Sequence, residues 1–257
     1  MNALIKKFRI KSFKKKRALV ALNRISLSFG NRRILEDINL NINENSIVGL
    51  LGPNGSGKST LFRIISGELL PDSGSVMFDN INATNIPIYS RTRRFRISYC
   101  PQHGGYFHNL SLLDNLNAIG EILIKDANRR NFKINELIAK FELDVVRNVE
   151  ARFLSGGQKR KLVIAMALLG DPKILLLDEP FSALDLQSIS TLQQLIVNLQ
   201  AERNLGIIVC DHNAESLLRV IDSGYILSNC KIMAQGTPSE LIRDDKSHYF
   251  PESFKFN

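Results

Sequence analysis

Residues 52–59 carry the residue types that would bind phosphate groups. The segment reads Gly-Pro-Asn-Gly-Ser-Gly-Lys-Ser and fits the spacing Gly-x-x-x-x-Gly-Lys-Ser/Thr. Glycines let successive backbone N–H groups turn toward phosphate oxygens, and a helix start adds the positive end of its dipole. The Lys58 ammonium would reach the β- and γ-phosphates, and the Ser59 hydroxyl would coordinate Mg²⁺. The predicted nucleotide-binding residues of this segment are Gly52, Pro53, Asn54, Gly55, Ser56, Gly57, Lys58, Ser59 and Thr60.

Two carboxylates follow an apolar run that would form a buried strand. Residues 174–177 are Ile-Leu-Leu-Leu, and Asp178 and Glu179 come next. Acids at the end of a buried strand are unfavourable unless something positive meets them there. Asp178 is therefore predicted to hold Mg²⁺ together with Ser59, and Glu179 to polarise a water for in-line attack on the γ-phosphate. The chemistry that these residues predict is hydrolysis of a nucleoside triphosphate.

A third segment provides a second phosphate-binding helix start. Ser155 fits an N-cap, and Gly156 and Gly157 would expose backbone N–H groups ahead of a long helical run. With Leu154 before them and Gln158 after them, the segment reads Leu-Ser-Gly-Gly-Gln, which resembles the signature sequence of ABC-type ATPases. The resemblance implies that Ser155, Gly156, Gly157 and Gln158 bind the γ-phosphate of ATP held by a second subunit. Two nucleotides would then lie between two head-to-tail domains.

Further residues match the pattern of that family in the order it has along the chain. Gln102 is similar to the glutamine that senses Mg²⁺ and the membrane partner, so the resemblance makes it both a catalytic residue and a metal ligand. Residues 182–185 resemble the D-loop, and His212 resembles the switch histidine that contacts the γ-phosphate. Phe29 stands where the family usually has a tyrosine that stacks on adenine, and a phenyl ring keeps that π-face. The alternative for Phe29 is an ordinary core residue.

The elements that must position these residues can be predicted from hydrophobic periodicity and turn residues. Strands alternating with helices indicate a mainly parallel sheet that is covered on both faces. We expect strands over residues 19–29, 34–42, 46–51, 75–79, 96–100, 173–177 and 206–210, and a terminal hairpin over 225–228 and 231–234. We expect helices over residues 59–66, 112–124, 134–141, 156–169, 188–203 and 214–220.

The resemblance implies an α/β fold, a P-loop NTPase of ABC type. Such a fold has a mainly parallel sheet core, an antiparallel β subdomain and a helical subdomain. We expect a single ATPase domain over residues 18–257, with the helical subdomain inserted at about residues 87–165, behind a basic N-terminal extension over residues 1–17.

The positive charge of the chain is concentrated in that extension. The formal net charge is +9, but residues 1–17 hold eight Lys or Arg and no acid, which leaves 26 basic against 25 acidic residues elsewhere. The high pI therefore belongs to the extension and not to a basic binding face of the domain. No nucleic-acid partner is expected, because the resemblance implies that ABC ATPases acting on nucleic acid typically have two cassettes in one chain or a long coiled-coil insertion, and this sequence shows neither. Three interpretations of the extension stay open: a solvated tail, a contact with anionic lipid at ~1 kcal/mol per basic residue, and an organellar transit peptide.

The composition excludes several other classes of protein. Apolar residues make up 44% and charged residues 23%, which is ordinary for a globular protein and excludes a disordered or collagen-like chain. The cysteines Cys100, Cys210 and Cys230 lack CxxC spacing, which argues against a zinc site and a secreted disulfide framework. No apolar run approaches the ~18–20 residues that span a bilayer. Work at a membrane would therefore need a partner.

Three stretches of the sequence indicate which kind of ABC ATPase this chain resembles. Residues 91–102, 210–213 and 249–254 are similar to the ATP-binding subunit of lipopolysaccharide export systems. That resemblance implies a homodimer with ATP at its interface, bound beneath two integral membrane permease subunits. It places the protein in the cytoplasm, peripheral on the cytoplasmic face of a Gram-negative inner membrane, where it would power lipopolysaccharide extraction. The alternatives are the ATPase of an importer for branched-chain amino acids or another small solute, and a soluble ABC ATPase acting on nucleic acid.

The segment over residues 106–112 follows Gln102 and carries two aromatic residues, Tyr106 and Phe107. We expect it to form the groove that receives the coupling helix of the permease. The alternative for Phe107 is packing inside the helical subdomain.

Overall fold

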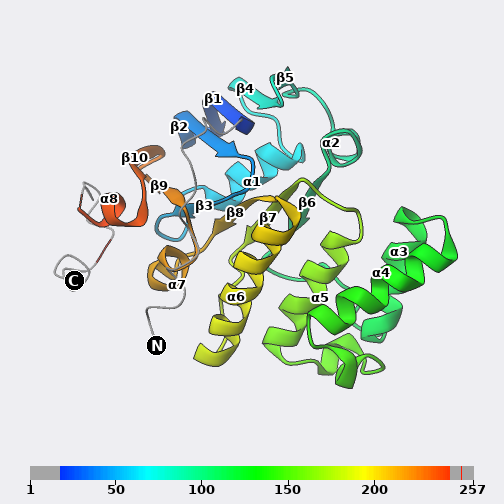
Figure 1. The fold of residues 1–257 in the computed structure, drawn as a ribbon. Helices are drawn as coiled ribbons and strands as arrows, with labels where there is room; N and C mark the ends of the chain where they lie inside the picture. Colours follow the sequence, from blue (N-terminus) through cyan, green and yellow to red (C-terminus); the bar gives the residue numbers. More distant parts are fainter. Residues whose placement is uncertain (1–17, 244–249, 251–257) are drawn as a thin grey trace.

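The computed structural model describes residues 18–243 and Phe250, and these form two β-sheets surrounded by helices (Figure 1). The expected basic extension over residues 1–17 lies outside the described residues. Of the stretch 249–254, which contributed to the resemblance above, only Phe250 is described, and it is buried.

The larger sheet holds the strands that lead into the candidate site. Its spatial order is β10 (Lys231–Gly236), β9 (Ser223–Ser228), β3 (Ser46–Leu51), β8 (Gly206–Cys210), β7 (Ile174–Asp178) and β6 (Ile97–Cys100). The strands from β9 to β6 are parallel, and β10 adds an antiparallel edge. Strands β3, β7 and β8 are buried at every position because both faces of the sheet are covered. Their carboxyl ends meet at one edge of the sheet, where ligands of such sheets bind.

The smaller sheet is antiparallel, in the order β2 (Arg32–Asn43), β1 (Ala18–Phe29), β4 (Ser73–Phe78) and β5 (Ile81–Asn82). Helix α1 (Lys58–Ser66) lies between the two sheets (Figure 1). Its Phe62 belongs to one core cluster with Phe78 of the smaller sheet and Leu50 of the larger sheet. A second cluster joins the other face of the larger sheet to α5 (Gly156–Leu168), α6 (Leu186–Arg203) and α7 (Ala214–Leu218).

The helical part of the molecule extends to one side of the larger sheet (Figure 1). Helix α3 (Leu112–Leu123) packs on α4 (Ala127–Lys140) and on α5. Two short 3₁₀ turns, η1 (Asp144–Val146) and η2 (Ala151–Phe153), connect α4 to α5, and α8 (Pro238–Arg243) follows β10. The limits of a helical subdomain at about 87–165 stay a prediction.

Helix α2 (Ile88–Phe95) and the short β5 are absent from the predicted elements, and α4 begins at Ala127 rather than at residue 134. Helix α2 has no apolar stripe, because its two buried residues are Arg91 and Phe95. The first turns of α4 are largely exposed, and the helix begins there because the Asp126 side chain accepts the Arg129 N–H at 2.7 Å. Periodicity cannot detect either feature.

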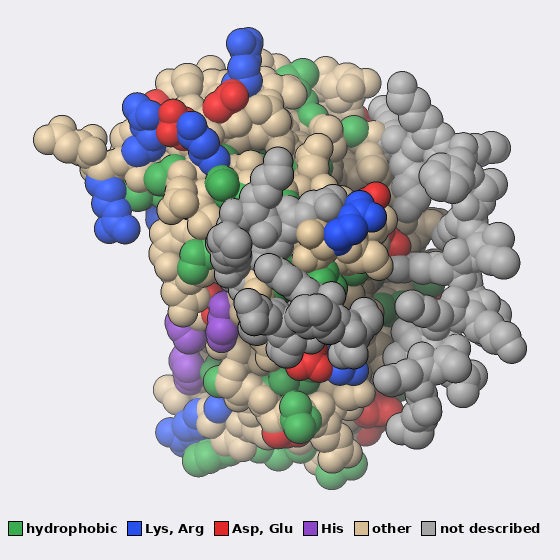
Figure 2. Space-filling view, turned by 90° about the vertical axis from the view of Figure 1, so that its left-hand side faces the viewer, with side chains coloured by type: hydrophobic (Ala, Val, Ile, Leu, Met, Phe, Trp, Pro, Cys, Tyr) green, Lys and Arg blue, Asp and Glu red, His purple; other side chains and the backbone are tan. Residues whose placement is uncertain are grey.

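Within the described ranges, no helix is long and apolar enough to cross a lipid bilayer. Figure 2 shows basic and acidic side chains mixed over the described part of one face, as the balanced charge outside the N-terminal extension predicts.

Candidate active site

The glycine-rich segment joins the end of β3 to the start of α1. Gly57 is the N-cap of α1 with φ +104°, and Gly52 has φ +151°. A Cβ at Gly52 would lie 2.1 Å from the carbonyl oxygen of Leu227, so no side chain fits at this position. The segment therefore turns from strand into helix in a conformation that only glycine adopts readily. The first N–H groups of α1 have no acceptor inside the helix and are available to an anion.

Two polar groups of this segment are poised for an oxygen-rich ligand. The buried Lys58 Nζ donates to the carbonyl oxygens of Gly52 at 2.8 Å and Pro53 at 3.0 Å. The Ser56 Oγ is buried and has no hydrogen-bond partner among the residues that the structure describes. Phosphate oxygens would satisfy both groups, since they accept hydrogen bonds from ammonium and hydroxyl donors.

The Asp178 carboxylate lies at the end of β7 and collects three donors from three other elements. Its Oδ1 accepts from Ser59 Oγ at 3.1 Å and from Cys210 Sγ at 2.8 Å, and its Oδ2 accepts from the Tyr99 hydroxyl at 2.9 Å. Burial, together with the nearby Asp178, raises the pKa of the Tyr99 phenol and of the Cys210 thiol well above the usual range. Both groups therefore keep their protons at neutral pH and act as donors to Asp178.

Glu179 brings the three predicted catalytic residues together at one oxygen. Its Oε2 accepts from Gln102 Nε2 at 2.7 Å and lies 3.0 Å from His212 Nδ1. The Glu179 side chain is 10% exposed, whereas that of His212 is 44% exposed. Glu179 has φ +43°, a left-handed conformation uncommon for this residue, and its N–H donates to the carbonyl oxygen of Cys210 at 2.8 Å.

Arg160 of α5 is a site residue that the sequence analysis missed. Its guanidinium donates to the carbonyl oxygens of Pro101 at 2.9 Å, Gln102 at 2.5 Å and Glu179 at 3.1 Å. Burial lowers the pKa of Arg160 below its ordinary value. The side chain joins the loop after β6 to the end of β7, and so holds Gln102 beside Glu179. The run over residues 159–161 is basic throughout, and nothing in the sequence distinguishes the residue that points inward.

Asp211, between β8 and His212, fixes the neighbouring loops. It is fully buried and accepts the N–H groups of Phe181 at 3.0 Å and Asn213 at 2.8 Å. Burial raises the pKa of this carboxyl. The loop that follows Glu179 and the loop that carries His212 are thereby tied to one side chain.

Residues 155–158, at the start of α5, make no described hydrogen bond to the phosphate-binding segment before α1. Ser155 caps α5: the Gln158 N–H donates to Ser155 Oγ at 3.2 Å, and the Ser155 N–H donates to Gln158 Oε1 at 2.9 Å. A Cβ on Gly156 would lie 3.1 Å from the Leu184 side chain of the D-loop, and a Cβ on Gly157 would lie 3.0 Å from Ser188 Oγ at the start of α6. No hydrogen bond described for residues 18–243 joins these four residues to residues 52–60.

The sequence analysis left two possible roles for each of two phenylalanines, and both side chains are exposed. Phe29, at the end of β1, is 50% exposed, and Phe107 is 51% exposed. The alternatives that placed them in the core or inside the helical subdomain are therefore wrong. Tyr106 does pack against the core cluster beneath it.

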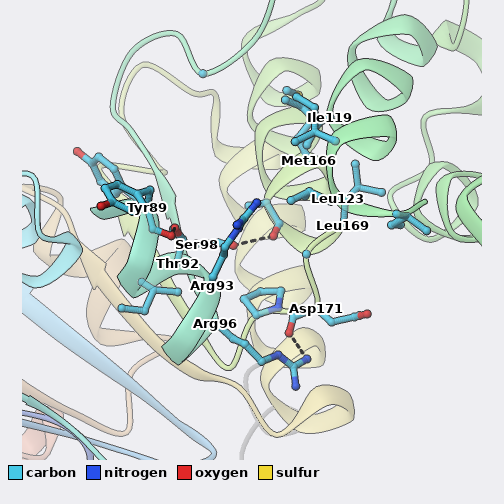
Figure 3. A pocket seen from close by; sticks show the side chains of 18 of the residues that line it. Tyr89, Thr92, Arg93, Arg96, Ser98, Ile119, Leu123, Met166, Leu169 and Asp171 are labelled. Atoms are coloured by element: carbon cyan, nitrogen blue, oxygen red, sulfur yellow. Dashed lines mark hydrogen bonds between the residues drawn. The ribbon is translucent and has the colours of Figure 1, made fainter. Parts of the chain in front are cut away.

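A groove of about 1370 Å³ opens between α2, β6 and the ends of α3 and α5 (Figure 3). Its lining is apolar at Ile119, Leu123 and Met166, and basic at Arg93 and Arg96. Pro101, which neighbours Gln102, and Tyr99 also line the groove. The expected groove residues 106–112 are not among the residues that line this groove, whose lining includes Gly105 and resumes at Ile119 in α3.

Known proteins with this sequence pattern and fold are ATP-binding cassettes. The ABC transporter family model matches residues 35–182. The lipopolysaccharide export system ATP-binding protein LptB of Escherichia coli (strain K12) is 37% identical over 93% of this chain and 99% of its own length. The structure of cbiO1 from Clostridium perfringens, part of the ABC transporter complex cbiONQ, has a TM-score of 0.81 at 25% identity over 90% of this chain and 93% of its own.

A dimeric ATP-binding cassette solved in a post-hydrolysis state with ADP and Pi has a TM-score of 0.75 at 28% identity, and the match covers 85% of this chain and 98% of that one. The motifs, the two-sheet architecture and these relatives agree. The chain belongs to the ABC transporter family and is an ATP-binding subunit that hydrolyses ATP.

Proposed function

We propose that residues 52–60 hold the phosphates of ATP and that Glu179 accepts the proton of the attacking water. The observation that carries this proposal is the meeting of Gln102 and His212 at one Glu179 oxygen, directly after the strand that ends in Asp178. A buried carboxylate held by two side chains is preorganised for a general base. Lys58 leaves its two loop carbonyls for the β- and γ-phosphates, and Phe29 offers an exposed ring to the adenine.

The donor set suits Mg²⁺. Ser59 contributes a hydroxyl, Asp178 a carboxylate and Gln102 an amide oxygen, all hard oxygen ligands. Ser59 Oγ already lies 3.1 Å from Asp178 Oδ1, so two of these three groups are adjacent. The bound ion would neutralise charge on the β- and γ-phosphates. Asp178 and Ser59 would hold it, and Gln102 would link it to the loop beside the groove.

The signature residues serve the nucleotide of a second copy in this proposal. Ser155 and Gly156 are exposed at the start of α5, and the glycines leave backbone N–H groups uncovered. Since they make no described hydrogen bond to residues 52–60 of their own chain, a head-to-tail homodimer would place them on the partner's γ-phosphate. A dimeric cassette with ADP and Pi is among the similar structures.

The groove would receive a helix of an integral membrane permease, with an acidic group facing Arg93 and Arg96. Its apolar wall, its basic rim and its contact with the loop of Gln102 support this role. The subunit would then sit on the cytoplasmic face of the inner membrane. The relative named LptB, 37% identical over nearly its whole length, supports lipopolysaccharide as the exported molecule.

The chemical part is tested by Glu179→Gln, which keeps the shape and removes the base. We expect ATP binding to persist while hydrolysis falls by about 10²–10⁴-fold, the usual contribution of a general base. Phosphate release and nucleotide binding measure the two effects. Glu215→Gln removes an exposed carboxylate outside the site and should change neither. Hydrolysis at the parent rate in Glu179→Gln would refute the assignment of the base.

The transport part is tested by depleting the chain in its own cells. We expect lipopolysaccharide to accumulate in the inner-membrane fraction and the permease to co-purify with the tagged chain. Normal lipopolysaccharide distribution together with a loss of solute uptake would assign the chain to an importer instead.

A further inference from the structure

Tyr99 occupies the boundary between the candidate metal site and the groove. It is paired with Leu176 across β6 and β7, so its ring stands beside the carboxyl end of the strand that carries Asp178. The ring packs edge-on against Phe62 of α1 with 6.3 Å between centroids, and Tyr99 is among the residues that line the groove. The hydroxyl donates to Asp178 Oδ2 at 2.9 Å.

The two oxygens of Asp178 have different neighbours. Oδ1 receives the Ser59 hydroxyl and the Cys210 thiol, whereas the described donor to Oδ2 is Tyr99. A hydroxyl has one O–H donor and two lone pairs, so Ser59 can offer a lone pair to a metal ion and still donate to Oδ1. The bond from Tyr99 is on the other oxygen and does not compete with either contact. It can therefore hold the carboxylate plane while Oδ1 faces Ser59 and the candidate metal site.

We propose that Tyr99 is a positioning residue for metal-dependent nucleotide binding, and that its hydroxyl fixes the orientation of the Asp178 carboxylate. This proposal rests on the proposed role of Asp178 and Ser59 as holders of Mg²⁺. Phe62 restrains the ring, so the hydroxyl has little freedom to leave Asp178.

The test is Tyr99→Phe, which removes one oxygen and keeps the ring on Phe62. Two affinities are measured for each variant: that of ATP in EDTA, and that of Mn²⁺ for the ATP-loaded protein by electron paramagnetic resonance. We expect ATP binding in EDTA to stay within twofold of the parent value. We expect Mn²⁺ binding to weaken about tenfold, equivalent to about 1.4 kcal/mol. High Mg²⁺ should restore kcat, because the defect lies in binding the ion.

The matched control is Tyr225→Phe. The Tyr225 hydroxyl bonds the backbone of Asn41 at 3.0 and 3.3 Å, away from the site, so both affinities should stay unchanged. If Tyr99→Phe lowers stability, unfolded protein weakens both apparent affinities by the same factor. The ratio of the two affinities then still describes the folded protein. An equal loss of both affinities, or no loss of Mn²⁺ affinity, overturns the proposal.

A failure of the proposed function gives a different result. Asp178→Asn should abolish Mn²⁺ binding to the ATP-loaded protein. If it does not, the metal role of Asp178 is wrong. If Asp178→Asn abolishes Mn²⁺ binding but Tyr99→Phe binds Mn²⁺ like the parent, only the inference about Tyr99 fails.

Discussion

Arg91 of α2 is a fully buried cation whose guanidinium binds backbone carbonyls of two other segments. It donates to Ile64 at 2.6 Å and Ile65 at 2.9 Å at the end of α1, and to Thr84 and Ile86, each at 2.7 Å. Burial lowers the pKa of Arg91 to about 10, so the side chain remains charged at neutral pH. A cation at the C-terminus of α1 also complements the helix dipole. Arg91 thus anchors α2, and with it one wall of the groove, to the helix that begins at the phosphate-binding segment.

Replacing Arg91 by Met removes the guanidinium from these four carbonyls. The Ile64 oxygen keeps a second donor, the Gly67 N–H at 3.3 Å, whereas the Ile65 oxygen is buried and loses the guanidinium. The two carbonyls after β5 are partly buried and recover some hydration. At ~1–3 kcal/mol for a buried unsatisfied group, and less for the partly buried pair, we expect a loss of about 3–5 kcal/mol. That is a large share of the ~5–15 kcal/mol that stabilises a typical domain.

Urea unfolding of the nucleotide-free protein, followed by circular dichroism, measures this loss. Arg91→Lys should lose less, because it keeps the charge and some donors but cannot span four carbonyls. Arg93→Met is the control: Arg93 lies on the same helix with an exposed side chain, and its replacement should change the free energy of unfolding by less than ~0.5 kcal/mol. An Arg91→Met protein that unfolds within ~1 kcal/mol of the parent would refute the account of this buried cation.

Three further predictions concern the cysteine thiols, the sites shared between two subunits and the N-terminal extension. Iodoacetamide should label the half-buried Cys230 long before Cys210, because burial raises the pKa of the Cys210 thiol and only the thiolate reacts; peptide mass spectrometry would contradict this by finding equal labelling. A Ser155→Arg subunit mixed with a Lys58→Ala subunit should form at most one intact site, so hydrolysis restored to the full parent rate would contradict sites shared between subunits. Deleting residues 2–17 should leave the ATPase activity of the isolated subunit unchanged and weaken flotation with anionic vesicles at low salt, since each engaged basic residue adds ~1 kcal/mol and salt screens the attraction; equal flotation of both forms at low salt would exclude the lipid contact.

Local sequence was sufficient wherever a residue's role follows from its immediate neighbours. Gly52 and Gly57 occupy positive-φ positions between a buried strand and a helix, as the spacing of the phosphate-binding segment predicts. The apolar run that ends in Asp178 is a strand buried at every position. Ser155 is the N-cap that its type indicates. The family followed from the order of such segments, because each is continuous in sequence.

Only the tertiary structure decided which side chains from distant segments contact the same carboxylate. Tyr99, Cys210 and Arg160 act on Asp178 and Glu179 across strands and helices, and no local pattern marks them. Their positions depend on the order and register of β6, β7 and β8, which sequence alone does not specify. Hydrophobic periodicity did not predict helix α2 for a related reason. Its inward face is built around a buried charge rather than an apolar stripe, and the carbonyls that make this burial tolerable come from segments that precede it in the chain.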